Sequence, residues 1–174
     1  FHDDWLSCED LLMKYKTKFI AASRKQALLV ENMLIPGQEV SVIPFPVENK
    51  EFYFAPEIRE KTREEMNWKD HTIFLYTGRL SYQKNTYTMS KIFTEAIEEK
   101  RIPQNSKLIF IGNFEDIGFS HIGRHFGHSE YFRKFWKKFE ELNEHKDKIV
   151  FMGAVENEKL MPIYNASDVY FSLS

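Results

Sequence analysis

Short apolar runs alternate along the chain with segments whose apolar residues recur at helical spacing. Runs of four to six apolar residues predict strands buried on both faces, and the amphipathic segments between them predict helices that cover those faces. Proline and glycine mark several of the ends. The pattern predicts strands at 18–22, 40–43, 72–76, 107–111, 149–152 and 168–173, and helices at 10–15, 24–34, 55–67, 86–100, 131–142 and 157–165.

This order of elements predicts an α/β fold with a Rossmann-like parallel sheet flanked by helices, joined by right-handed crossovers. Ligands of such sheets bind beyond the carboxyl ends of the strands. Three of the expected strand ends carry a glycine, namely Gly78, Gly112 and Gly153. Each glycine would let a ligand approach the backbone closely, or it would only form a turn, and both interpretations stay open.

The segment T-I-F-L-Y-T-G-R-L-S-Y-Q-K-N carries the strongest chemical signal. Its apolar run stops at Gly78, Arg79 follows at once, and Lys84 stands where the next helix begins; we name residues 78–85 the cation loop. A helix start offers unpaired N–H groups and a partial positive charge, and Arg79 and Lys84 add a planar fork and a mobile point charge. The loop therefore predicts a diphosphate site, with two solvated cations as the alternative.

Composition limits the function classes. The 174 residues carry a net charge of −2, with 43% hydrophobic and 29% charged residues, so we expect one domain, or one domain and a fragment of another, and no binding of nucleic acid. The one cysteine, Cys8, excludes an internal disulfide and suggests a cytoplasmic location. No apolar run approaches the ~20 residues of a transmembrane helix. Because the chain starts at Phe1 and stops at Ser174, after an apolar run, we expect a piece of a longer protein.

The cation loop G-R-L-S-Y-Q-K-N resembles the donor-phosphate loop of the retaining glycosyltransferases of family 4, which have the GT-B fold. The resemblance covers nearly the whole chain, from residue 17 to residue 174. T-K-F-I-A-A-S and V-S-V-I-P-F-P-V are similar to the crossing between the two GT-B domains, and K-L-I-F-I-G to the second donor-domain strand. I-V-F-M-G-A-V-E-N-E-K-L-M-P-I-Y-N-A-S-D-V-Y-F-S-L-S is similar to the segment that binds the nucleoside.

The resemblance implies the C-terminal half of a GT-B fold, truncated, with residues 1–40 as the tail of the N-terminal domain and the interdomain connection, and 41–174 as the donor-binding domain. Arg79 and Lys84 would be the catalytic groups, because they would hold the leaving diphosphate. Asp168 is expected to be structural, and Leu160 has plain core packing as its alternative. The residues implied to contact the donor are Gly78, Asn85, Gly112, Gly153, Val155 and Leu160.

The intact protein would then move a sugar from a nucleotide diphosphate sugar to a hydroxyl of a glycan or lipid-linked acceptor, with no metal or other cofactor, in the cytoplasm or at the inner face of the membrane. The isolated chain is expected to be inactive, because the family's E-x7-E motif would follow Ser174. A non-catalytic scaffold and a nucleotide-sugar epimerase of the same fold are the alternatives. An NAD-dependent enzyme is disfavoured because no G-x-G-x-x-G follows a strand.

Two other patterns have competing interpretations. His121, His125 and His128 would share one face of a helix and could bind zinc, but Gly123 and Gly127 interrupt that helix, so no metal site is expected. The basic segment R-K-F-W-K-K at 133–138 could lie on a membrane surface or bind a partner. We favour the simpler arrangement, in which its aromatic residues cover the sheet and its lysines face water.

Overall fold

The computed structural model describes residues 18–34, 39–46, 50–114 and 130–173. The chain divides into two compact units, Phe1–Asn49 and Lys50–Ser174. The division into these units falls after Asn49, because the strand at Val40–Val42 pairs within the first unit; the domain boundary after residue 40 that the resemblance implied stays a prediction. The identity of the first unit as the tail of a further domain stays a prediction.

The first unit holds two parallel strands, β1 (Phe19–Ala21) and β2 (Val40–Val42), with Phe19 opposite Val40. Helix α3 (Arg24–Leu29) follows β1, and the Ser23 side chain caps it by accepting a hydrogen bond from the Gln26 N–H. The helix expected over 24–34 changes to π-helical turns at Val30–Leu34. The helix expected at 10–15 lies outside the described residues.

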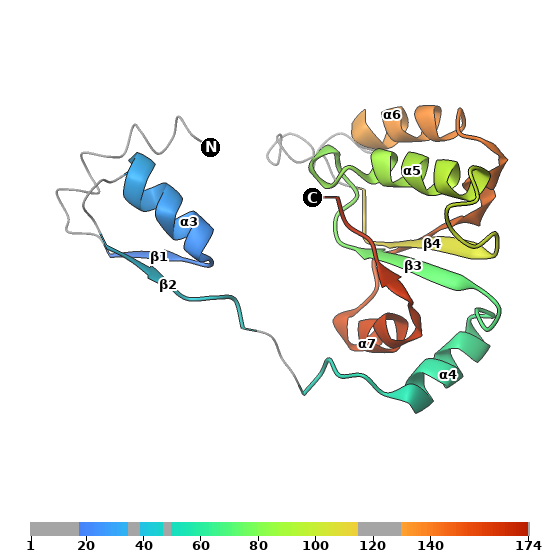
Figure 1. Ribbon diagram of the computed structural model, residues 1–174, viewed down its shortest axis with the longest axis horizontal. Coiled ribbons are helices and arrows are strands. Elements are labelled where there is room, and N and C mark those ends of the chain that lie inside the picture. Colours follow the sequence, from blue (N-terminus) through green and yellow to red (C-terminus); the bar gives the residue numbers. More distant parts are fainter. Residues whose placement is uncertain (1–17, 35–38, 47–49, 115–129, 174) are drawn as a thin grey trace. The chain divides into compact units, whose positions relative to one another are not determined.

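The second unit is built on a four-stranded parallel sheet in the order β5-β4-β3-β6 (Figure 1). Its strands are β3 (Thr72–Thr77), β4 (Ser106–Ile111), β5 (Ile149–Gly153) and β6 (Val169–Tyr170). The expected α/β fold with a parallel sheet is confirmed. β6 is shorter than the predicted strand 168–173, and it lies at the edge of the sheet, where Val169 and Tyr170 stay exposed.

Helices cover both faces of this sheet, as the apolar runs predicted. Helices α5 (Thr86–Glu98) and α6 (Glu130–Phe139) lie on one face, and α4 (Pro56–Glu65) and α7 (Asn157–Ala166) on the other (Figure 1). Alternate strand residues point to opposite faces, so each face has its own buried cluster. The first cluster contains Tyr76, Leu80, Met89, Phe93, Ile97, Leu108, Phe110, Tyr131, Phe135, Phe139 and Ile149; the second contains Trp68, Ile73, Leu75, Ile109, Ile111, Ile163 and Ala166.

The face of α6 that packs on the sheet is aromatic. Tyr131, Phe135 and Phe139 recur every four residues and are 1–6% exposed. The cations of the same helix, at 133, 134, 137 and 138, are exposed. The structure therefore agrees with the favoured interpretation of the basic segment, and it leaves a positive surface on the outer side of α6.

Two side chains at the end of α7 and just after it form hydrogen bonds with the first part of this unit, residues 53–73. Asn165 is 5% exposed; its Oδ1 accepts a hydrogen bond from the Ala55 N–H at 2.7 Å, and its Nδ2 donates to the Tyr53 carbonyl at 2.9 Å. Asp168 accepts hydrogen bonds from the Ile73 N–H at 2.7 Å and from two arginines of α4, Arg59 at 2.5 Å and Arg63 at 3.2 Å.

Asp168 has a structural role at the junction of α7 and β6, as expected. Burial raises the pKa of its carboxyl, but the hydrogen bonds from the Ile73 N–H, Arg59 and Arg63 outweigh burial and hold the pKa below its ordinary value. Arg63 itself is 8% exposed, so this carboxylate balances a largely buried cation.

Candidate functional site

The three strand-end glycines lie along one edge of the sheet and are connected by hydrogen bonds. The Gly78 N–H donates to the Ile111 carbonyl at 2.9 Å, and the Gly112 N–H donates to the Gly153 carbonyl at 2.7 Å. All three have positive φ, at 138°, 139° and 73°. The carboxyl ends of β3, β4 and β5 therefore form one continuous backbone edge, the place where parallel sheets bind ligands.

The surroundings of two of these glycines differ, although close approach of a ligand to either stays a prediction. A Cβ on Gly112 would lie 1.9 Å from the Gly78 carbonyl oxygen, so packing between neighbouring strand ends already requires glycine there. A Cβ on Gly153 would meet nothing within 4 Å. Gly153 thus has open space on the side where a Cβ would stand.

The cation loop is anchored by its backbone and by Leu80, while Arg79 stays exposed. Leu80 is 1% exposed, and its N–H donates to the Asn113 carbonyl at 2.8 Å. Beneath the loop, the buried Tyr76 hydroxyl donates to the Arg79 carbonyl at 2.9 Å. Burial raises the pKa of Tyr76 to about 12, so this donor keeps its proton at neutral pH. The loop therefore carries the Arg79 backbone on a fixed support.

The second cation stands at the start of α5. Lys84 ends a short 3-10 turn, Tyr82–Lys84, and Asn85 follows in the left-handed region with φ 51°. The Asn85 side chain does not cap α5; its Nδ2 donates to the Leu173 carbonyl at 2.9 Å, which connects the cation loop to the segment after β6. The predicted placement of Lys84 at a helix start is confirmed, and the contact of Asn85 with a donor stays a prediction.

Val155 and Leu160 lie after β5, in the segment expected to bind the nucleoside. Both are half-buried and pack against the second core cluster. Leu160 thus packs against the core, which was the alternative to its predicted contact with the donor. A contact of either residue with a nucleoside stays a prediction.

Sequence reasoning missed a group of hydroxyls at the same edge. The Thr77 hydroxyl, at the end of β3, is 2.6 Å from the Tyr164 hydroxyl of α7, and the Tyr170 hydroxyl donates to the Thr77 carbonyl at 3.2 Å. These residues are 87 and 93 positions from Thr77, so no local pattern could bring them together. The one available signal was a tyrosine, Tyr164, next to buried residues of α7 such as Ile163 and Ala166.

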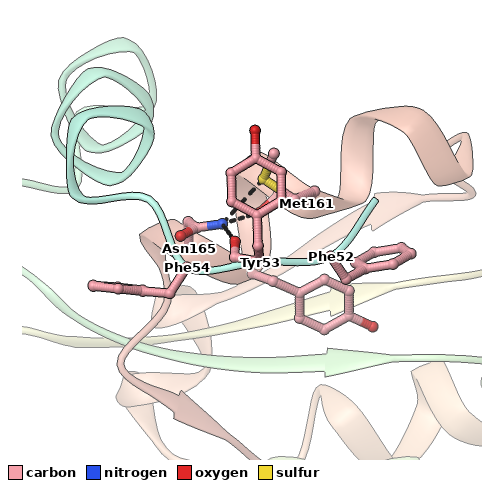
Figure 2. A pocket seen from close by; sticks show the side chains of 6 residues that line it. Phe52, Tyr53, Phe54, Met161 and Asn165 are labelled. Atoms are coloured by element: carbon pink, nitrogen blue, oxygen red, sulfur yellow. Dashed lines mark hydrogen bonds between the residues drawn. The ribbon is translucent and has the colours of Figure 1, made fainter. Parts of the chain in front are cut away.

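A pocket of about 400 Å³ lies next to Tyr164 (Figure 2). Figure 2 shows the Asn165 amide directed at Tyr53 and Met161, so hydrogen bonds within the wall occupy this polar group. The other walls are apolar or aromatic. The residues that line the pocket are Phe52, Tyr53, Phe54, Met161, Tyr164 and Asn165.

The described part of the chain contains no group of three or more His, Cys, Asp and Glu residues that could hold a metal ion. His121, His125 and His128 lie outside that part, as does Cys8. Within it, no helix has the length and apolarity needed to cross a membrane.

Comparison with known proteins gives matches to solved structures only. No family profile and no curated protein matches the chain. HepE from Anabaena, in complex with UDP and glucose, superposes with a TM-score of 0.69 at 15% identity, over 97% of this chain and 40% of HepE. A glycosyltransferase from Rickettsia africae gives 0.62 at 21%, over 95% and 41% of the two chains. Sucrose-phosphate synthase from Thermosynechococcus elongatus gives 0.57 at 22%, over 87% and 33%.

These neighbours are glycosyltransferases of the GT-B fold. At such low identity the likeness shows the fold, and it confirms the expected Rossmann-like half of a GT-B protein. The chain spans less than half the length of each of the three.

Proposed function

We propose that this chain is the donor-binding part of a glycosyltransferase similar to family 4. The intact protein would transfer a sugar from a nucleotide diphosphate sugar to a hydroxyl of a glycan or lipid-linked acceptor, with retention of the anomeric configuration, in the cytoplasm or at the inner face of the membrane. One observation carries the proposal. A single edge of the sheet combines the supported cation loop with the open space beside Gly153.

In this proposal Arg79 and Lys84 hold the diphosphate while the bond to the sugar breaks. The leaving diphosphate gains negative charge at that moment, and two cations placed beforehand stabilise it. Neither cation has to give up a proton, because a diphosphate is a good leaving group as an anion. Since the two side chains supply the positive charge, we propose that donor binding needs no metal ion.

The remaining roles follow from position along the edge. Gly78 and Asn85 begin and end the cation loop, and Gly112 keeps the ends of β3 and β4 in contact. Gly153 and Val155 would face the base, with Leu160 behind them. Support for a nucleotide sugar as the ligand comes from HepE, whose structure was solved in complex with UDP-glucose and superposes with a TM-score of 0.62 at 17% identity.

Calorimetric titration of the 174-residue chain with UDP, with and without EDTA, tests the proposal. Hydrogen bonds to charged groups contribute about 1.5–3 kcal/mol, so Arg79→Ala should raise the Kd about 10- to 100-fold. Arg101→Ala is the matched control, because Arg101 is exposed and precedes β4, at the opposite edge of the sheet. EDTA should leave the affinity unchanged. Equal affinities for the two variants would refute the assigned diphosphate site.

A further inference from the structure

A second cavity, of about 210 Å³, lies beside the cation loop. Its walls come from the 3-10 turn Tyr82–Lys84, the first turn of α5, and α6. Ligand sites for drug-sized molecules usually measure about 300–1,000 Å³. This cavity would therefore accept only a small ligand.

Aromatic rings form the inner walls of the cavity. Tyr131, 2% exposed, lies with its ring centroid 4.4 Å from that of Tyr82, and the two rings meet edge to face. Tyr87 and Phe135 line the cavity as well, and their rings also meet edge to face, at 6.4 Å. These contacts join α6 to the cation loop and to α5, so the walls are built from packed side chains.

Two lysines of α6 supply charge. Lys134 and Lys138 both line the cavity, one helical turn apart and therefore on the same side of the helix. The Lys138 ammonium lies 5.5 Å from the centroid of the Tyr87 ring, which places this charge against the cavity wall. Among the described residues that line the cavity, none is acidic.

We propose that this cavity binds a small phosphate-bearing anion, held by Lys134 and Lys138. A phosphate monoester carries about −1.5 to −2 charge at pH 7, which two ammonium groups can balance. Asn85 and Thr88, also in the lining, add polar groups for the remaining phosphate oxygens. The same phosphate chemistry occurs in a free anion and in a lipid headgroup.

Binding here would act on the cation loop. Tyr82 and Asn85 belong both to the cavity and to the loop that carries Arg79 and Lys84. An anion in the cavity would therefore change the affinity for a donor diphosphate, and the donor would change the affinity for the anion by the same factor. This coupling rests on the proposed function; the binding of the anion does not.

Titration of the 174-residue chain with inorganic phosphate, followed by ³¹P NMR or calorimetry, tests the proposal. The test variant is Lys134→Ala/Lys138→Ala. Its matched control, Arg133→Ala/Lys137→Ala, removes the same charge from exposed positions of α6 that do not line the cavity. Wild type and control should show saturable binding, and the test variant should bind at least about tenfold more weakly. Equal weakening in both variants, or no saturable binding, would overturn the proposal.

Sedimentation with phosphatidylcholine vesicles, with and without phosphatidylglycerol, identifies the source of the anion. A headgroup in the cavity predicts that only Lys134→Ala/Lys138→Ala loses vesicle binding, whereas a free anion predicts that wild type does not sediment while phosphate still binds. Equal loss in both variants would show diffuse attraction to the basic side of α6 and would count against the cavity. The proposed UDP site and the proposed anion site can be refuted independently. Arg79→Ala should weaken UDP binding and retain the binding of inorganic phosphate.

Discussion

Replacing Gly112 by alanine tests how the ends of β3 and β4 meet. A Cβ at this position would lie 1.9 Å from the Gly78 carbonyl oxygen and 2.8 Å from the Gly78 carbonyl carbon. Ordinary contact begins at 3.4 Å, so the strand ends must separate by about 3.4 − 1.9 = 1.5 Å. The obstacle is backbone, which cannot rotate away as a flexible side chain would.

The energetic cost has two parts. Alanine at φ 139° is strained, which costs about 1–3 kcal/mol. A shift of that size also breaks the hydrogen bonds from the Gly78 and Gly112 N–H groups, at about 1 kcal/mol each. We therefore expect Gly112→Ala to lower the free energy of unfolding of the second unit by about 3–5 kcal/mol.

Gly153→Ala is the matched control, because it introduces the same methyl group at a strand end where nothing lies within 4 Å. Its cost is backbone strain alone, about 1–2 kcal/mol at φ 73°. Urea denaturation should be followed by circular dichroism and by hydrogen exchange of the β3 and β4 amides, which report on the second unit. A difference between the variants below about 1 kcal/mol would refute the contact described between Gly78 and Gly112.

Two further predictions concern the polar groups that hold the second unit together. Asn165→Ala leaves the Ala55 N–H and the Tyr53 carbonyl without their partner, so we expect a loss of about 2–4 kcal/mol in urea denaturation and faster hydrogen exchange at Ala55; unchanged exchange would contradict this. Asp168→Asn should cost about 2–3 kcal/mol at pH 7, between the values for surface and buried ion pairs. Because the folded pKa of Asp168 lies below 3.8, its contribution is complete above pH ~4 and is lost as the pH falls through the folded pKa. The difference between wild type and Asp168→Asn should therefore shrink in acid, and a difference that grows would refute the ion-pair explanation.

The order of elements was predictable because its signals are local. The apolar run of β3 ends at Gly78, and the spacing of Met89, Phe93 and Ile97 marks one face of α5. The same local signals placed Arg79 and Lys84 on one loop at the correct edge of the sheet. The sequence of a single segment carries much less information about its neighbours in the fold. The short β6 and the π-helical turns at Val30–Leu34 were therefore not predicted.

The site was predictable only as far as its residues are close in sequence. Gly112 reads as a turn or a ligand contact, and only the pairing of Thr77 with Ile111 shows that it lies against Gly78. Asn165 reads as a polar helix residue, whereas its partners are 110 and 112 positions away. Such contacts depend on the finished fold, which is why neither spacing nor composition revealed them.

The Asn165 side chain also has a consequence for synthesis on the ribosome. Ala55 leaves the ribosome 110 residues before its partner does, and at about 5–20 residues per second that interval is roughly 6–22 s. Phe54, 73% exposed even in the folded unit, is next to Ala55 and has no support from α7 during this time. The backbone at Tyr53 and Ala55 can therefore be fixed by the Asn165 side chain only after α7 has emerged, so the opening segment of the second unit is among the last parts of this unit to become ordered during synthesis.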